Sequence, residues 1–119
     1  MSALKQFYKA RYERYRELLN WKRHLPSLLG AVRKILPEAE VYIFGSVLRG
    51  ELTANSDIDV LIVSKSSLGR ERFKVATAIE EQLEAPTIFE FHFANEEEMD
   101  WYKRHAGELV PIGDLVDIH

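Results

Sequence analysis

The sequence predicts an α/β (α+β) fold in which helices flank a small mixed β-sheet. Three short apolar segments bounded by turn residues have the composition of strands: 41–44, 56–63 and 87–93. Three further segments carry apolar residues at three- and four-residue spacing, which predicts helices: 4–34, 68–84 and 95–107. At 119 residues, the chain is expected to be one domain with a modest core, residues 1–119.

Residues 1–37 are predicted to form two N-terminal helices. An apolar stripe with helical spacing fills the first, and we expect it to face the core: Leu4, Phe7, Tyr8, Tyr12, Tyr15, Leu18 and Leu19. Pro26 stands where the second helix can begin, and Pro37 ends it. Residues 1–36 have a charge balance of +7, whereas the remainder of the chain has −10. The basic face is either a solvated helix surface or a site that attracts nucleic acid or an acidic partner.

The strand at 41–44 ends in Gly45-Ser46, a pair suited to binding a phosphate. Gly45 permits a tight turn or a close approach of the backbone to a ligand. Ser46 opens a short helical stretch closed by Gly50, and free backbone N–H groups at a helix start form an anion site beside the serine hydroxyl. Arg49 lies about one helical turn further on and is within reach of the same anion. The structural alternatives are an ordinary turn and a surface arginine.

Two aspartates, Asp57 and Asp59, begin the apolar run that continues to Val63. Side chains two residues apart in a strand lie on one face, so these carboxylates should project side by side. Like charges that close repel each other and are costly to desolvate, and a divalent cation resolves both problems. Ten residues separate Ser46 from Asp57, enough for a hairpin-like return. The two ends are then expected to meet on adjacent strands and to hold a nucleoside triphosphate with magnesium, although Ser56-Asp57 is alternatively a simple turn.

The helix predicted at 68–84 crosses one face of the sheet and has apolar positions at Phe73, Val75, Ala76, Ile79 and Leu83. It returns the chain to the strand at 87–93, where the polar residues Glu90 and His92 share one face. Glu90 is the better candidate for a third metal ligand, because magnesium prefers oxygen and tolerates imidazole poorly. His92 is a weaker candidate for contacting the acceptor or a phosphate. The alternative for Glu90 is an ordinary solvent-facing strand position.

Asn95 is predicted to cap the last helix, with Glu96, Glu97 and Glu98 in its first turn, and Gly107 to end it. Residues 108–119 leave a tail, an added strand or a contact with another chain as alternatives. No apolar stretch has the length of a membrane span, and no signal-peptide pattern opens the chain. The absence of cysteine excludes disulfides and thiolate metal sites, and is compatible with a cytoplasmic location.

Gly45-Ser46, ten intervening residues and then Asp57-Ile58-Asp59 resemble the signature of the DNA polymerase β-type nucleotidyltransferase superfamily. The flanking runs 44–51 and 56–63 are also similar, and the small size resembles the minimal nucleotidyltransferases of bacteria and archaea. The resemblance spans residues 41–93. It implies a nucleotidyltransferase fold in which 41–93 is the catalytic core, 1–37 supplies N-terminal helices and 95–107 a C-terminal helix.

The resemblance implies metal-dependent transfer of a nucleoside monophosphate, AMP from ATP, to an acceptor. Asp57 and Asp59 would hold two Mg²⁺ ions, and Glu90 would bind the catalytic ion and help deprotonate the attacking group. Members of the family commonly have aspartate at the position of Glu90. Gly45, Ser46 and Arg49 would bind the nucleotide phosphates.

The minimal members resemble the antitoxins of two-component toxin–antitoxin pairs. The resemblance therefore also implies a partner, a small helical HEPN-type ribonuclease that the antitoxin adenylylates or binds, in a homo- or hetero-oligomer. Two alternatives stay open. One is a nucleotide-binding antitoxin that neutralises its partner by binding alone, and the other is a small-molecule nucleotidyltransferase, such as one that modifies an aminoglycoside.

Overall fold

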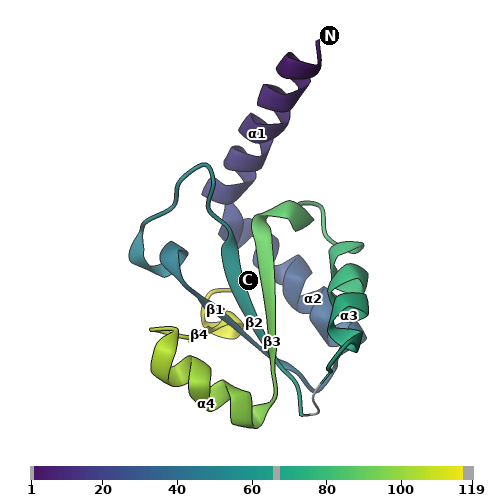
Figure 1. Ribbon diagram of the computed structural model, residues 1–119, viewed down its shortest axis with the longest axis vertical. Helices are drawn as coiled ribbons and strands as arrows, with labels where there is room; N and C mark the ends of the chain where they lie inside the picture. Colours follow the sequence, from purple (N-terminus) through teal and green to yellow (C-terminus); the bar gives the residue numbers. More distant parts are fainter. Residues whose placement is uncertain (1, 66–67, 117–119) are drawn as a thin grey trace.

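The computed structural model of the chain describes residues 2–65 and 68–116. Four α-helices and four strands alternate with short 3₁₀ segments (Figure 1). The helices are α1 (Ala3–Leu19), α2 (Leu25–Ile35), α3 (Glu71–Glu80) and α4 (Glu96–His105). The strands are β1 (Glu40–Phe44), β2 (Ile58–Val63), β3 (Phe89–Ala94) and β4 (Val110–Pro111). The 3₁₀ segments are η1 (Trp21–His24), η2 (Ser46–Arg49), η3 (Pro86–Ile88) and η4 (Ile112–Asp114).

The four strands form one mixed sheet in the order β3-β2-β1-β4. β1 runs antiparallel to β2 and to β4, whereas β2 and β3 are parallel and are joined through α3. In this register Asp59 lies between Phe44 of β1 and Glu90 of β3. A mixed sheet flanked by helices confirms the predicted fold class.

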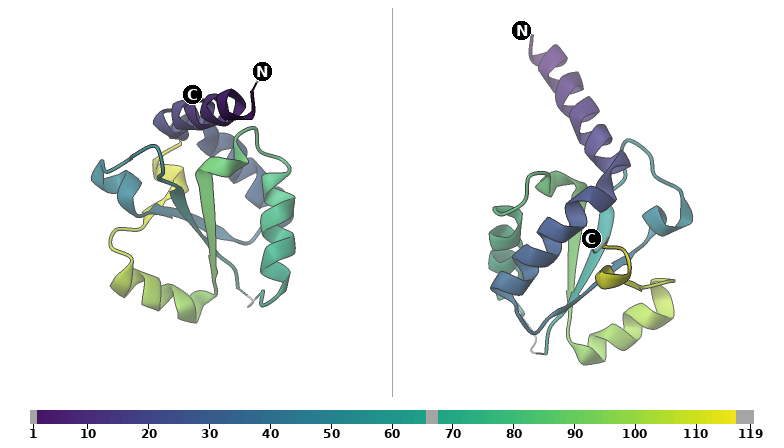
Figure 2. Two further views of the ribbon diagram at one scale, coloured as in Figure 1. Left: turned by 45° about the horizontal axis from the view of Figure 1, so that its top comes forward. Right: turned by 180° about the vertical axis from the view of Figure 1, so that it is seen from behind.

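Helices cover the two faces of the sheet unequally (Figures 1 and 2). On one face, alternate strand residues such as Ile43 and Val60 pack with α2 and α3 in the main core. On the other face, Phe44, Leu61 and Val63 pack with Met99 of α4 in a smaller cluster. α4 lies toward the end of this face where β3 finishes, so the end where β2 and β3 begin is left open. Polar residues can therefore stand on that part of the sheet without being buried.

Local signals set most of the element boundaries. Gly50 ends η2 in the left-handed region at φ +69°, and Asn95 begins α4 with a capping box that pairs it with Glu98. α3 is shorter than the segment 68–84 predicted as a helix. Within the tail, Val110–Pro111 is an added edge strand, while residues 117–119 lie outside the described part of the chain. Among the described helices, none is long and apolar enough to cross a membrane.

The prediction that the apolar stripe of α1 faces the core is wrong for most of its length. Leu18 is buried and Tyr15 partly buried, but the remaining large apolar side chains are more than half exposed: Leu4, Phe7, Tyr8, Tyr12 and Leu19. The reason is that α1 projects beyond the sheet, so only its last turns reach the core (Figure 1). Phe73, one of the apolar positions noted for the helix at 68–84, is 68% exposed on α3. Periodicity identifies an apolar face but not what covers it.

Two neighbouring leucines test which side chains at the end of α1 pack in the core. Leu18→Ala should lower the free energy of unfolding by about 2–5 kcal/mol, because its side chain is fully buried. Leu19→Ala, at a side chain that is 57% exposed, should change it by less than about 0.5 kcal/mol. Urea unfolding of both variants measures the difference, and equal losses would contradict the exposed position of Leu19.

Candidate metal and nucleotide site

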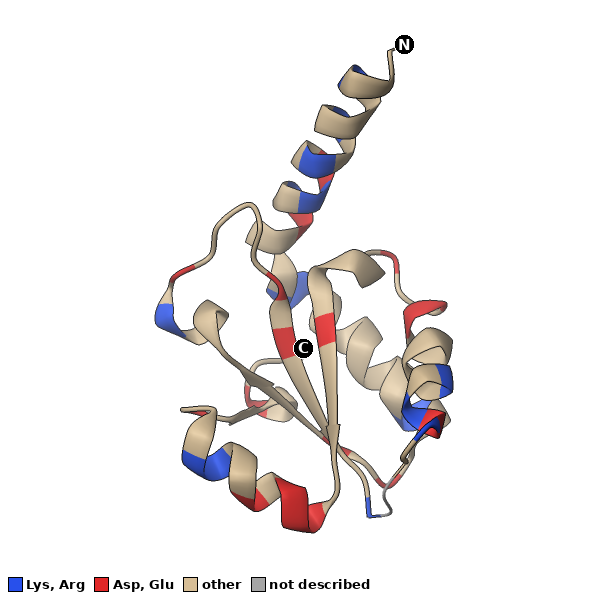
Figure 3. Cartoon of the chain, in the orientation of Figure 1, with Lys and Arg blue, Asp and Glu red and all other residues tan. Residues whose placement is uncertain are grey.

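Three potential metal ligands meet on the open part of the sheet. Asp59, Glu90 and His92 each offer a ligand atom, and these atoms all lie within 4.8 Å of one another. His92 Nε2 lies 3.3 Å from Asp59 Oδ1 and 4.0 Å from Glu90 Oε1. The acidic positions of β2 and β3 stand side by side in Figure 3. Two carboxylates and an imidazole are a donor set that suits a divalent cation.

The sheet register explains why these side chains meet. Asp59 and Glu90 are direct partners on the parallel strands β2 and β3, and His92 follows two residues later on the same face. The His92 ring packs edge-on against Phe44, with ring centroids 5.1 Å apart, and this contact orients the imidazole. Tyr102 of α4 packs on Phe44 in turn. Burial raises the pKa of Tyr102, Glu98 adds to the shift and Arg72 opposes it, so the phenol stays protonated at neutral pH.

Gly45 brings the backbone after β1 directly against the Asp59 carboxylate. A Cβ atom on Gly45 would lie 2.2 Å from Asp59 Oδ2, closer than any real contact allows. Gly45 also has φ +87°, in the region that favours glycine. The position therefore requires glycine for two independent reasons. The close approach of Gly45 to Asp59 also brings the next residue, Ser46 at the start of η2, near this carboxylate.

Asp57 takes a different direction from the one expected for a metal ligand beside Asp59. It lies outside the Asp59–Glu90–His92 cluster found among the described residues. Its Oδ1 accepts a hydrogen bond from Arg14 Nη2 of α1 at 2.5 Å. The structure thus brings together Asp59 and Glu90 but holds Asp57 on the side of α1.

The other two side chains predicted to bind phosphate, Ser46 and Arg49, are the first and last residues of η2. Ser46 is partly buried at the start of η2. Arg49 Nε donates to Glu51 Oε2 at 3.1 Å, and both side chains are more than half exposed. An exposed pair of this kind contributes only about 0–1 kcal/mol, so Arg49 can leave it for a stronger anion at little cost.

From the sequence, His92 is only a weaker candidate for contacting the acceptor or a phosphate, and Arg14 is not identified. Strand alternation places His92 on the same face as Glu90, so its position in the cluster is predictable. Arg14 had none, because it reaches Asp57 across 43 residues of chain. No local spacing rule detects a contact of that separation.

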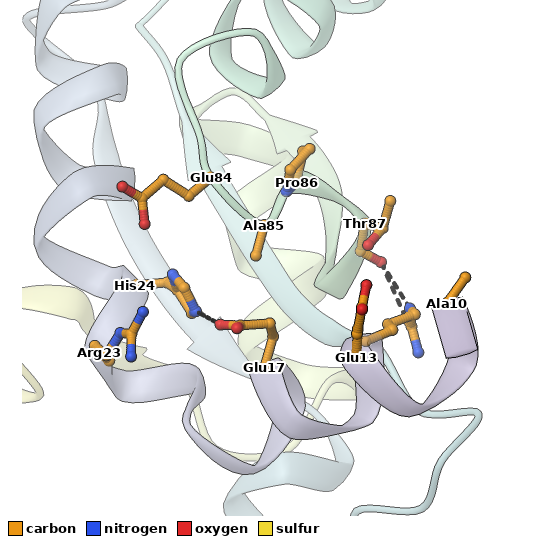
Figure 4. Close-up of a pocket in the computed structure, with 10 residues that line it drawn as sticks. Ala10, Glu13, Glu17, Arg23, His24, Glu84, Ala85, Pro86 and Thr87 are labelled. Carbon is orange, nitrogen blue, oxygen red and sulfur yellow. Dashed lines mark hydrogen bonds and ion pairs between the residues drawn. The ribbon is translucent and has the colours of Figure 1, made fainter. Parts of the chain in front are cut away.

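Two cavities border this region. One, of about 300 Å³, lies beside His92 at the outer edge of β3 and is lined by Phe73, Phe91 and Tyr102 among others. The second, of about 430 Å³, lies between α1, η1 and η3 (Figure 4), and Arg14 is among the residues that line it. Within this cavity the Glu17 carboxylate forms a hydrogen bond with the imidazole of the buried His24. Glu84 projects from the other side of the cavity.

The comparisons with known proteins identify a family and a fold. The model of the nucleotidyltransferase domain family matches residues 25–110. A crystal structure described as a "putative nucleotidyltransferase" is 28% identical with a TM-score of 0.51, covering 74% of this chain and 96% of its own. Another structure so described, from Sulfolobus solfataricus, is 23% identical with a TM-score of 0.53 and shares the fold, covering 80% of this chain and 85% of its own. Among curated proteins, none matches the chain.

Proposed function

Since the chain belongs to the nucleotidyltransferase domain family, we propose that it transfers AMP from ATP to a partner protein and acts as an antitoxin. The observation that carries the proposal is the cluster of Asp59, Glu90 and His92 directly beside Gly45-Ser46. A site for metal-bound phosphates needs carboxylates and an open backbone approach at one place, and this end of the sheet supplies both.

The nucleotide is proposed to lie across the start of β2 with its phosphates toward η2. The Ser46 hydroxyl and the backbone at Gly45 would hold the terminal phosphates, and Arg49 would exchange Glu51 for a phosphate oxygen. Asp59 and Glu90 would hold Mg²⁺, with Asp57 joining them when it leaves Arg14. Bound divalent ions supply charge neutralisation to the phosphates and to the leaving pyrophosphate.

The proposed position of the nucleotide implies the side from which an acceptor would approach. In-line displacement requires the attacking oxygen to enter opposite the leaving pyrophosphate. With the terminal phosphates on the η2 side of Asp59, the acceptor enters from the β3 side, where Glu90 stands. The Glu90 side chain is 56% exposed, so it can accept the proton of an incoming hydroxyl group. His92 would lie within reach of the same hydroxyl or of the α-phosphate.

The projecting part of α1 supports a protein as the partner. Its exposed apolar residues, Leu4, Phe7, Tyr8, Tyr12 and Leu19, form one helical face that we call the α1 stripe. Lys5, Lys9 and Arg16 border this stripe at helical spacing. The partner that fits is a protein with an apolar helix face bordered by carboxylates, and the family resemblance makes a small helical HEPN-type toxin the proposed candidate. A second copy fits less well, because pairing two α1 helices brings like charges together.

The test is incubation with α-labelled ATP and Mg²⁺, with and without a small helical protein that co-purifies with this chain or is encoded next to it. We expect label on the partner protein, and its loss in the Asp57→Asn/Asp59→Asn variant. ATP binding and tight partner binding without transfer would instead leave an antitoxin that acts by binding alone. Label on an added aminoglycoside when the partner protein is absent would favour the small-molecule enzyme.

The α1 stripe has its own expected outcome in the same system. Phe7→Glu/Tyr12→Glu should weaken partner binding at least about tenfold while leaving the unfolding midpoint unchanged, because both side chains are exposed. Calorimetry measures the affinity. Light scattering of the wild-type chain alone tests the alternative that a second copy binds the α1 stripe. A stable dimer that dissociates on the same substitutions would assign the stripe to this homodimer.

A further inference from the structure

We infer that Arg14 competes with the divalent cation for Asp57, so that helix α1 controls how tightly the site binds metal. The inference rests on the proposed metal site and adds a residue outside the motif that defines it. Its basis is the set of contacts that Arg14 makes. The guanidinium donates to Asp57 Oδ1 at 2.5 Å, to the Thr87 carbonyl at 3.0 and 3.2 Å, and to the Ala54 carbonyl at 3.3 Å.

These contacts tie the Arg14 guanidinium of α1 to two other segments of the chain. Ala54 and Asp57 belong to the loop before β2, and Thr87 belongs to η3 before β3. The Arg14 side chain is only 24% exposed, so breaking its pair with Asp57 costs more than breaking an exposed surface pair. Arg14 therefore acts as a positioning residue for Asp57, not as a group that touches substrate.

The direction in which Asp57 is held matters for the metal. The oxygen that pairs with Arg14 cannot also serve as a ligand on the side of Asp59, and the guanidinium charge repels a nearby divalent cation. Both effects lower metal affinity while the pair is intact. Once released, Asp57 can turn to the face it shares with Asp59, two residues along the chain.

The cavity behind α1 gives the Arg14 side chain somewhere to go when it leaves Asp57. Arg14 lines this space of about 430 Å³, as do Glu13 and Glu84, which Figure 4 labels. The carboxylates of Glu13 and Glu84 are alternative partners for the guanidinium, so leaving Asp57 does not strand a buried charge. Because Arg14 lies on the helix that carries the α1 stripe, a partner bound there can shift the balance between the two positions.

The test is the affinity for Mn²⁺, measured by calorimetry and by electron paramagnetic resonance. Arg14→Gln should bind Mn²⁺ about tenfold more tightly than the wild-type chain, which corresponds to about 1.4 kcal/mol. In the Asp57→Asn background the same substitution should give a gain of about twofold or less, because only the repulsion between the guanidinium and the cation is then removed. The matched control is Arg11→Gln, on the same helix, whose side chain donates to Asn55 Oδ1 at 2.8 Å but to no carboxylate of the site.

Unchanged or weaker binding by Arg14→Gln overturns the inference, as does an equal gain in the Asp57→Asn background. A second readout needs no substitution: saturating Mg²⁺ should shift the Arg14 Nη signals in the nuclear magnetic resonance spectrum of the wild-type chain, because Nη2 donates to Asp57 Oδ1. Nη signals that do not change at saturation also overturn it. If neither the wild-type chain nor any variant binds Mn²⁺, the proposed metal site is wrong, and so is the proposed metal-dependent function.

Discussion

Asp59→Asn is expected to lower kcat/KM for nucleotidyl transfer by about 10³-fold or more, the loss typical of removing a central electrostatic group. Asp59 is the residue on which the site converges: it pairs in register with Glu90, contacts His92 and faces Gly45. Asparagine keeps the shape of the side chain but removes the charge that a divalent cation requires. Steady-state kinetics with labelled ATP, together with Mn²⁺ titration, measure both losses.

The control for this prediction is an aspartate of equal chemistry elsewhere in the fold. Asp100→Asn, at an exposed position on α4, should leave both activity and Mn²⁺ affinity unchanged. The unfolding midpoint of Asp59→Asn should be at least that of the wild-type chain, because a partly desolvated carboxylate beside Glu90 is relieved of repulsion. Retention of a tenth or more of the activity would show that the chemistry does not depend on this cluster.

The parts of the fold that the sequence predicted correctly are those with local causes. The turn at 45–50 depends on two glycines with positive φ, and the start of α4 depends on the Asn95 capping box. The placement of Glu90 and His92 on one face follows from strand alternation alone. Their meeting with Asp59 needs only that β2 and β3 be neighbours, which a short helical crossover favours.

What the sequence did not predict depends on relations between distant segments. The stripe on α1 has the same spacing whether it is buried or exposed, and the direction in which α1 leaves the sheet decides between them. Arg14 looked like one more member of a basic helix face. Its pairing with Asp57 requires that α1, the loop before β2 and η3 converge, which is a property of the assembled fold.

Gly45→Ala is expected to be the most damaging change that adds a single methyl group to the site. At φ +87° and ψ −157° the backbone lies in a region that is essentially restricted to glycine and costs another residue about 1–3 kcal/mol, and forcing a Cβ into Asp59 Oδ2 adds about 1–3 kcal/mol. The free energy of unfolding should therefore fall by about 2–6 kcal/mol. Activity should also be lost at temperatures where the variant is folded, because the Asp59 carboxylate must move to make room. Urea unfolding and label transfer measure the two effects separately.

Gly50→Ala measures the backbone cost of a positive φ without the cost of a contact. Gly50 has φ +69°, but a Cβ there would meet nothing within 4 Å. Its substitution should lower the free energy of unfolding by only about 1–2 kcal/mol, the backbone contribution alone, and should leave Asp59 in place. Gly45 and Gly50 occupy different backbone regions, so the difference between the two variants combines the cost of the Gly45 backbone with that of the Cβ contact to Asp59. Equal losses of stability and activity would contradict the geometry that places Ser46 beside Asp59.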